Sequence, residues 1–131
     1  MGSEMCIRDR KSGRFIITAS AAGLLSQIGS ASYTVTKHAA VAFADSIAIS
    51  HADDGIKVNC ICPQYVRTNM TKGMRMAEEG QDDFLEPVDV ANALLSAIKN
   101  DEFLVLPHEV CLLYTSPSPR DRTRSRMPSS A

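Results

Sequence analysis

The chain contains 131 residues, of which 44% are hydrophobic, and its formal net charge at pH 7 is −1. A chain of this length forms one ordinary domain, and the composition of its middle part excludes an intrinsically disordered or collagen-like protein. The charge is distributed unevenly, because residues 11–110 carry eight basic and twelve acidic residues, whereas residues 111–131 carry four basic residues and one acidic residue.

The two ends of the chain do not resemble protein-coding sequence. MGSEMCIRDR back-translates to a sequence that resembles a transposase-type sequencing adapter, and CLLYTSPSPRD fits the reverse complement of that adapter. We therefore expect residues 1–10 and 111–131 to be adapter-derived, the latter as a disordered tail, and exclude both from the fold. The Arg-rich tail is accordingly not interpreted as a nucleic-acid-binding arm, and we predict no nucleic-acid partner.

The first expected element is a strand from Phe15 to Ala19, because this short apolar run is rich in β-branched residues. Its continuous apolar character predicts that both of its faces are buried. Residues 24–32 are expected to form a loop. A second strand is predicted from Ile56 to Cys62, and it ends where Pro63 follows.

A long helix is predicted between these strands, from about Ala31 to Ala52. Ser30 or Ser32 can cap its start, and Gly55 is expected to end it. Apolar and small residues recur at helical spacing along this segment, namely Val35, Ala39, Ala42, Phe43, Ser46, Ile47 and Ser50.

The last third of residues 11–110 predicts one more helix and one more strand. Tyr65–Asn69 is expected to be a loop, and residues 70–83 have weak periodicity that suits a mobile flap or a short helix. A helix is predicted from Pro87 to about Lys99, followed by a strand at Phe103–Leu106. Strands that alternate with helices at these lengths predict an α/β fold with a parallel sheet.

The sequence offers little evidence for a disulfide, a metal site or a membrane span. Cys60 and Cys62 occupy alternate strand positions and are predicted to be buried small side chains and not a disulfide. A reducing cytoplasm is therefore the expected location. His38 and His51 are interpreted as packing or surface residues, because the histidines and cysteines lack metal-ligand spacing. No apolar run is long enough for a transmembrane helix.

Three polar residues are predicted to converge on one crevice. Tyr33 and Lys37 are four residues apart near the start of the long helix, so their side chains project from the same face. Ser20 follows the first strand, at the sheet edge where open α/β folds bind ligands. A Tyr-x-x-x-Lys pair alone is weak evidence, but this context favours a catalytic site.

The stretches GRFIITASAAGLLSQIGSASYTVTKHAAVAFADSIA and GIKVNCICPQYVRTNM closely resemble the short-chain dehydrogenase/reductase family, strongly from Gly13 to Met70 and loosely to Leu106. The resemblance implies a partial, doubly wound Rossmann-like sheet and an oxidoreductase. It identifies Ser20, Tyr33 and Lys37 as catalytic residues, and it assigns cofactor contacts to Tyr33, Lys37, Pro63, Val66 and Thr68. Gln64 departs from the family pattern, which has Gly there, and this questions the local backbone conformation.

The resemblance also implies a reaction, the interconversion of a small-molecule alcohol and a carbonyl by hydride transfer with NAD or NADP. Tyr33 would donate or accept the proton. Lys37 would lower the pKa of that tyrosine and bind the cofactor ribose, as a nearby ammonium favours a phenolate. Ser20 would polarise the substrate oxygen. No metal is implied. Candidates to line the substrate pocket are Leu24, Leu25, Gln27, Tyr65 and Met70.

The family's Gly-rich cofactor loop has no counterpart in residues 11–110, so the chain looks like the C-terminal half of such an enzyme and is expected to be inactive alone. The parent is expected to be a homo-oligomer, since in this family the long helix commonly packs against its copy. Two alternatives stay open, an epimerase or dehydratase of the same fold and a non-catalytic binding or regulatory protein. The residues expected to face the partner are Val35, Ala39, Ala42, Phe43 and Ser46.

Overall fold

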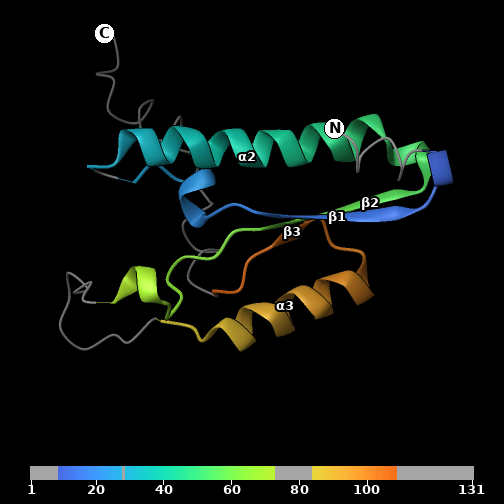
Figure 1. Ribbon diagram of the computed structural model, residues 1–131. Coiled ribbons are helices and arrows are strands. Elements are labelled where there is room, and N and C mark those ends of the chain that lie inside the picture. Colours follow the sequence, from blue (N-terminus) through green and yellow to red (C-terminus); the bar gives the residue numbers. More distant parts are fainter. Residues whose placement is uncertain (1–8, 28, 73–83, 109–131) are drawn as a thin grey trace, which may run out of the picture.

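The computed structural model describes residues 9–27, 29–72 and 84–108. Three parallel strands form one sheet in the order β1 (Gly13–Thr18), β2 (Ile56–Ile61) and β3 (Leu104–Val105). Helix α2 (Ala31–Ser50) lies on one side of this sheet and helix α3 (Pro87–Asn100) on the other (Figure 1). The predicted α/β fold with a parallel sheet is therefore confirmed.

Strand β1 is less buried than the sequence suggests. The prediction that both faces are covered is wrong, because Ile16 is 47% exposed and Thr18 is also exposed. Helix α2 packs on β1 and β2, whereas α3 packs mainly on β2 and β3, so one face of β1 has little cover. Within the described residues, β1 pairs with β2 alone and therefore forms an edge of the sheet.

Helix α2 begins at Ala31 as predicted and ends at Ser50, slightly before the expected end. Ser30 occupies the N-cap position, but its side chain makes no capping hydrogen bond, so the expected hydroxyl cap is absent. A 3₁₀ turn at Ala52–Asp54 follows the helix. Gly55 adopts a left-handed φ of 69° and ends this turn instead of α2 itself.

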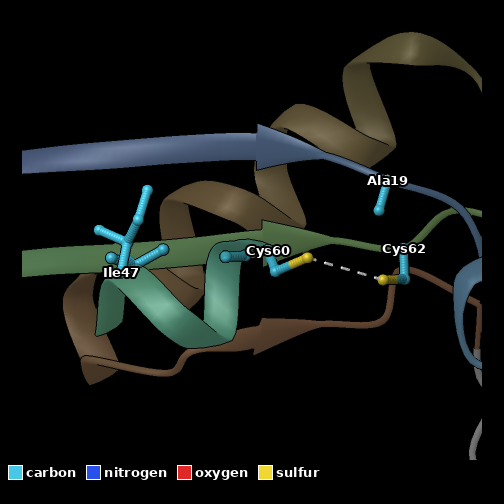
Figure 2. Close-up of a cluster of buried hydrophobic side chains, with 6 residues drawn as sticks. Ala19, Ile47, Cys60 and Cys62 are labelled. Carbon is cyan, nitrogen blue, oxygen red and sulfur yellow. Dashed lines mark hydrogen bonds between the residues drawn. The ribbon is translucent and has the colours of Figure 1, made fainter. Parts of the chain in front are cut away.

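Strand β2 contributes to two hydrophobic clusters because its side chains alternate between the faces of the sheet. Toward α2, Cys60 and Cys62 pack with Ala19 and Ile47, as Figure 2 shows. Ile61, which lies between these two cysteines in the sequence, points to the other face and packs with residues from α3 and β3. Because β2 is the central strand, it is buried from both sides and fixes the distance between the two helices.

Cys60 and Cys62 form no disulfide and are fully buried, as predicted. Their Sγ atoms lie 4.0 Å apart. The hydrogen bond from the Cys62 thiol lowers the pKa of Cys60, and burial acts in the opposite direction. The two thiols therefore behave as core side chains that contact each other.

Helix α3 begins at Pro87, where the sequence places its start. The Glu86 N–H donates to the Asp89 carboxylate at 3.0 Å, which satisfies a main-chain donor just before the helix. Part of the segment predicted as a flap or short helix, residues 73–83, lies outside the described residues. The part that is described includes a 3₁₀ turn at Asn69–Thr71. None of the helices in the described ranges has the length and apolarity needed to cross a membrane.

Candidate active site

Ser20 lies just beyond the carboxyl end of β1 and is 7% exposed. Its Oγ accepts a hydrogen bond from the Ala22 N–H at 3.2 Å, which caps the 3₁₀ turn η1 (Ala21–Gly23). A hydroxyl has one hydrogen to donate besides its acceptor lone pairs. Ser20 can therefore cap the turn and still donate a hydrogen bond to a ligand.

A cavity of about 250 Å³ opens beside Ser20. The turn after β1 and the segment after β2 form its walls, and the Ala21 N–H donates to the Pro63 carbonyl at 2.9 Å and holds the two walls together. Leu25, Gln27 and Tyr65 line the cavity, as predicted. The complete lining is Ser20, Ala21, Ala22, Leu25, Ser26, Gln27, Gln64 and Tyr65.

Two residues expected in the pocket lie elsewhere. Leu24 packs against the core cluster beneath α2, because the η1 turn directs it toward the sheet. Met70 lies in the short turn after β2 and is 89% exposed. Of the five residues predicted to line the substrate pocket, three therefore line this cavity and two do not.

Tyr33 and Lys37 lie side by side on the first turns of α2. The Lys37 Nζ is 5.6 Å from the centroid of the Tyr33 ring, and Tyr33 is 40% exposed. Within the described residues, neither the Tyr33 hydroxyl nor the Lys37 ammonium has a hydrogen-bond or ion-pair partner. Both polar groups are thus available to a ligand, although neither residue lines the cavity beside Ser20.

The turn that follows Ser20 packs directly against the helix that carries the Tyr–Lys pair. A Cβ atom at Gly23 would lie 2.6 Å from the Lys37 carbonyl oxygen, so only glycine permits this close approach. The Gln27 N–H donates to the Thr34 Oγ1 at 3.1 Å, which ties the next loop to the first turn of α2. These contacts hold the Ser20 turn against the part of α2 that includes Tyr33.

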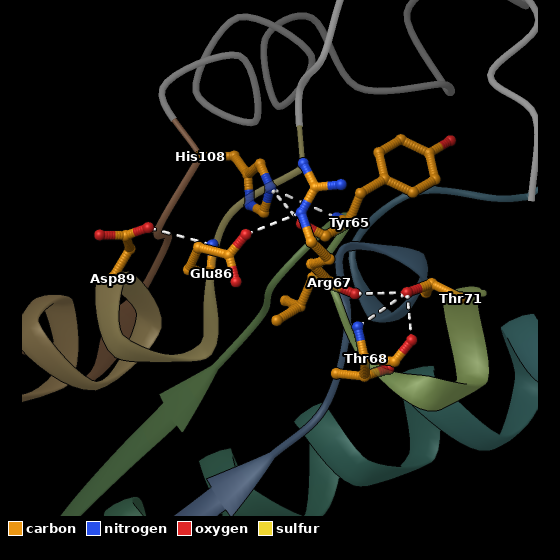
Figure 3. Close-up of polar contacts among 8 residues, drawn as sticks. Tyr65, Arg67, Thr68, Thr71, Glu86, Asp89 and His108 are labelled. Carbon is orange, nitrogen blue, oxygen red and sulfur yellow. Dashed lines mark hydrogen bonds and ion pairs between the residues drawn. The ribbon is translucent and has the colours of Figure 1, made fainter.

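The segment after β2 is organised by main-chain and hydroxyl contacts (Figure 3). Val66 forms a parallel bridge with Leu85, and the Thr71 hydroxyl donates to the Val66 carbonyl at 2.8 Å. Thr68 caps the 3₁₀ turn that follows and lines a second, wider hollow with Arg67, separate from the Ser20 cavity. Pro63, Val66 and Thr68 therefore lie on one ordered segment that leaves the sheet beside Ser20.

Gln64 fits its position without backbone strain. Apart from Lys11 and Asp101, no non-glycine residue in the described ranges has a positive φ, so Gln64 does not need the conformation that favours glycine. Gln64 is one of the residues that line the cavity beside Ser20. The departure from the family pattern thus brings no left-handed backbone conformation at this position.

His108 is a residue that the sequence reasoning missed. It is 6% exposed, and its ring contacts the backbone of Gln64 and Tyr65 in the cavity wall. A sequence signal existed, since His108 follows β3 at the sheet edge where Ser20 follows β1. The signal was weak because β3 has only two residues, which makes its end hard to place from the sequence.

The other two histidines lie outside the cavity. His38 is exposed on α2 with its Nδ1 2.9 Å from the Thr34 carbonyl, and the His51 Nδ1 lies 2.8 Å from the Asp54 carboxylate. Across the ranges that the structure describes, no three His, Cys, Asp or Glu residues come together in a way that could hold a metal ion.

Comparison with known families gives a match to a sequence model described as "short chain dehydrogenase" over residues 2–79. The match includes residues 2–10, which belong to the segment that we predict to be derived from a sequencing adapter. Among curated proteins, the chain is 35% identical over 86 residues to the oxidoreductase UcpA of Escherichia coli K12, covering 65% of this chain and 33% of that protein. It is 37% identical over 81 residues to a meso-2,3-butanediol dehydrogenase of Serratia marcescens, covering 62% and 32% of the two chains.

Solved structures share the fold. A short-chain dehydrogenase/reductase from Burkholderia phymatum in complex with NAD superposes with a TM-score of 0.74 at 22% identity, covering 94% of this chain and 53% of that one. A short-chain dehydrogenase from Sphingobium yanoikuyae in complex with NADPH gives a TM-score of 0.70 at 17% identity, with coverage of 96% and 50%. The chain thus spans about one third of the length of these curated relatives and about half of these structural neighbours.

Proposed function

The chain belongs to the short-chain dehydrogenase family, and on that premise we propose that residues 11–110 come from an oxidoreductase that interconverts a small-molecule alcohol and a carbonyl with NAD or NADP. The observation that carries the proposal is the Tyr33–Lys37 pair, whose hydroxyl and ammonium have no hydrogen-bond or ion-pair partner within the described residues. The helix that bears this pair packs against the turn of Ser20, which opens into a cavity.

Each of the three side chains has a distinct chemical task in this proposal. Reduction of a carbonyl leaves negative charge on oxygen, and the Tyr33 hydroxyl neutralises it by proton donation. The Lys37 ammonium, beside the ring, stabilises the phenolate that remains. The free hydroxyl hydrogen of Ser20 donates to the substrate oxygen and polarises the carbonyl. Oxidation of an alcohol uses the same groups in reverse.

The residues present fit the nicotinamide end of a dinucleotide. Lys37 forms no ion pair within the described residues, so its ammonium is available to the ribose hydroxyls. Pro63, Val66 and Thr68 would contact the nicotinamide end from the ordered segment after β2. When bound, the nicotinamide supplies or accepts the hydride. NAD and NADPH, seen in two structural neighbours, are both candidates.

The proposal extends to assembly and location. The outer face of α2 carries exposed apolar side chains, with Val35 67% and Phe43 56% exposed, and we infer that it packs against a second copy in a homo-oligomer. Cys60 and Cys62 are buried and form no disulfide, which suits a reducing cytoplasm. The substrate is a small molecule that fits beside Ser20, and neither nucleic acid nor membrane enters the reaction.

The test uses the full-length parent gene that contains residues 11–110. Purified parent is assayed for consumption of NADH and NADPH with short ketones, diketones and hydroxysteroid-derived ketones. Lys37→Ala is expected to lower turnover and weaken cofactor binding, since Lys37 serves both steps. Lys99→Ala, an exposed lysine in the last turn of α3, is the matched control and should leave both unchanged.

Two results would contradict this proposal. Conversion of substrate without net consumption of NAD(P)H would indicate an epimerase or dehydratase instead. Cofactor or ligand binding without any turnover, in a parent with intact Tyr33 and Lys37, would indicate a binding or regulatory protein.

A further inference from the structure

We propose that His108 is a positioning residue of the substrate cavity, which holds the backbone of Gln64 and Tyr65 in the wall that faces the ligand. The inference rests on the proposed function, because the cavity beside Ser20 is taken as the substrate site. It adds a residue from the end of β3 to a site otherwise built from the segments after β1 and β2.

The first argument is the hydrogen-bond geometry of the ring. The Gln64 N–H lies 3.2 Å from Nδ1, and Nε2 lies 2.9 Å from the Tyr65 carbonyl oxygen. A neutral imidazole with its hydrogen on Nε2 satisfies both contacts, because Nδ1 then accepts and Nε2 donates. Nε2 is also 3.3 Å from the Tyr65 N–H, but it cannot accept there while it carries the hydrogen. His108 thus holds two consecutive residues with both ring nitrogens.

The second argument is that this ring is the bridge between β3 and the cavity wall. The Tyr65 carbonyl also accepts from the Leu85 N–H at 3.0 Å, and the Tyr65 ring lies 5.6 Å from that of Phe84. His108, Tyr65 and the segment before α3 therefore meet at one point (Figure 3). Without His108, the segment 63–66 keeps its contacts toward Leu85 but loses these two hydrogen bonds with the residue that follows β3.

The third argument is burial. His108 is 6% exposed, although histidine is only moderately buried on average. A buried polar ring is costly unless its nitrogens are hydrogen-bonded, and its partners lie on the segment that shapes the cavity. An apolar residue could fill the same volume, but it would leave the Gln64 N–H and one acceptor site of the Tyr65 carbonyl without this partner. The polar contacts, beyond the packing, explain a histidine at this place.

The experiment compares three variants in the full-length parent. His108→Phe keeps the volume and removes both contacts, and loss of a hydrogen bond in the wall is expected to raise KM for the carbonyl substrate about tenfold. The cofactor Kd, measured by fluorescence titration, should stay unchanged. His108→Gln carries an acceptor and a donor at comparable spacing, so its KM should lie close to that of wild type. The KM of His108→Asn should lie between those of His108→Gln and His108→Phe.

Amide hydrogen exchange provides a readout independent of activity. His108→Phe should accelerate amide exchange in residues 64–66 and leave β2 unchanged. His51→Gln, at a histidine paired with Asp54 outside the cavity, should change neither exchange nor KM. If His108→Phe does not fold, the other two variants provide the test. KM and exchange near wild type in His108→Gln, with larger changes in His108→Asn, would support the inference, and equal values in the two variants would contradict it.

Equal KM and equal exchange in wild type, His108→Phe and His108→Asn would overturn the inference. So would failure of His108→Gln to restore KM where His108→Phe raises it, because the hydrogen bonds of the ring would then not account for the rise in KM. A wild-type parent without carbonyl reduction would overturn the proposed function instead, and the exchange of residues 64–66 would still decide whether His108 holds the wall.

Discussion

The wall of the Ser20 cavity and the Tyr33–Lys37 pair are built in different ways. The wall consists of turns from distant parts of the chain, joined by main-chain hydrogen bonds such as that from the Ala21 N–H to the Pro63 carbonyl. The pair needs only the periodicity of α2, which places residues four apart on the same face. Ser20 is nearly buried, whereas Tyr33 is 40% exposed.

Because of this difference, we expect substitutions in the two regions to have different effects. A substitution in the pair removes a chemical group and leaves the helix in place, because the side chains of Tyr33 and Lys37 contribute little to the core. A substitution in the wall changes several backbone contacts together, since each turn is held by the next. Chemistry and shape are therefore expected to respond to different substitutions.

The largest effect is expected from Tyr33→Phe in the parent, which removes the proton donor but keeps the ring. Turnover should fall by about 10² to 10⁴, the usual contribution of a positioned general acid, while cofactor binding stays largely intact. Steady-state kinetics and cofactor titration measure the two quantities. Ser46→Ala, an exposed position on the same helix, is the control. Near-normal turnover in Tyr33→Phe would refute the role of Tyr33.

Gly23→Ala tests the contact between the two regions. The added methyl group would meet the Lys37 carbonyl oxygen and the Val41 side chain, 2.8 Å away at Cγ2, and the backbone oxygen cannot rotate aside. Overpacking of this kind costs about 1–3 kcal/mol of unfolding free energy. Urea denaturation of the parent should show this loss, together with reduced turnover because the Ser20 turn moves away from α2.

Gly29→Ala is the matched comparison for that variant. Gly29 has a φ of 81° but no atom within 4 Å of its Cβ position, so alanine there brings backbone strain without a clash. A loss of stability with normal turnover is expected. Equal losses of turnover in the two variants would show that the close approach at Gly23 does not organise the site.

Phe43→Asp tests whether the outer face of α2 has a partner. This side chain is 56% exposed and lies on the face that we assign to the homo-oligomer. A charge in an apolar interface should dissociate the parent into smaller species, seen by size-exclusion chromatography with light scattering. Asp45→Asn, exposed on the same helix, serves as a control for charge changes outside this apolar stripe. An unchanged oligomer in Phe43→Asp would place the interface elsewhere.

The smallest effect is expected away from both regions, at the exposed Asp101. A hydrogen bond from Lys57, with further help from Arg14, lowers the pKa of this carboxyl below its ordinary value. A lowered pKa in the folded state stabilises the protein above the unfolded pKa, and this contribution is lost as pH falls through the folded value. Wild type should therefore exceed Asp101→Asn slightly in urea midpoint at pH 7, and the difference should vanish in strong acid.

Asn is the suitable replacement because Asp101 has a φ of 57°, a conformation that Asn also adopts easily. A difference that persists unchanged below the pKa would show that it comes from the backbone and not from the charge.

Local sequence patterns were enough to predict the order of the elements. Periodicity predicts α2, α3 and the strands, and four-residue spacing alone places Lys37 beside Tyr33. Ser20, Tyr33 and Lys37 could be named as candidate site residues because they lie close together in the chain.

Tertiary structure decided the remaining features, since they depend on segments that are far apart in the sequence. The exposure of Ile16 follows from where α3 packs, and the need for glycine at Gly23 follows from a helix backbone fourteen residues later. His108 reaches the cavity wall only because β3 pairs with β2 and brings the end of one strand beside the segment that follows the other. The local sequence around a residue does not predict such contacts, because neighbouring parallel strands are connected by long crossovers and are therefore far apart in the sequence.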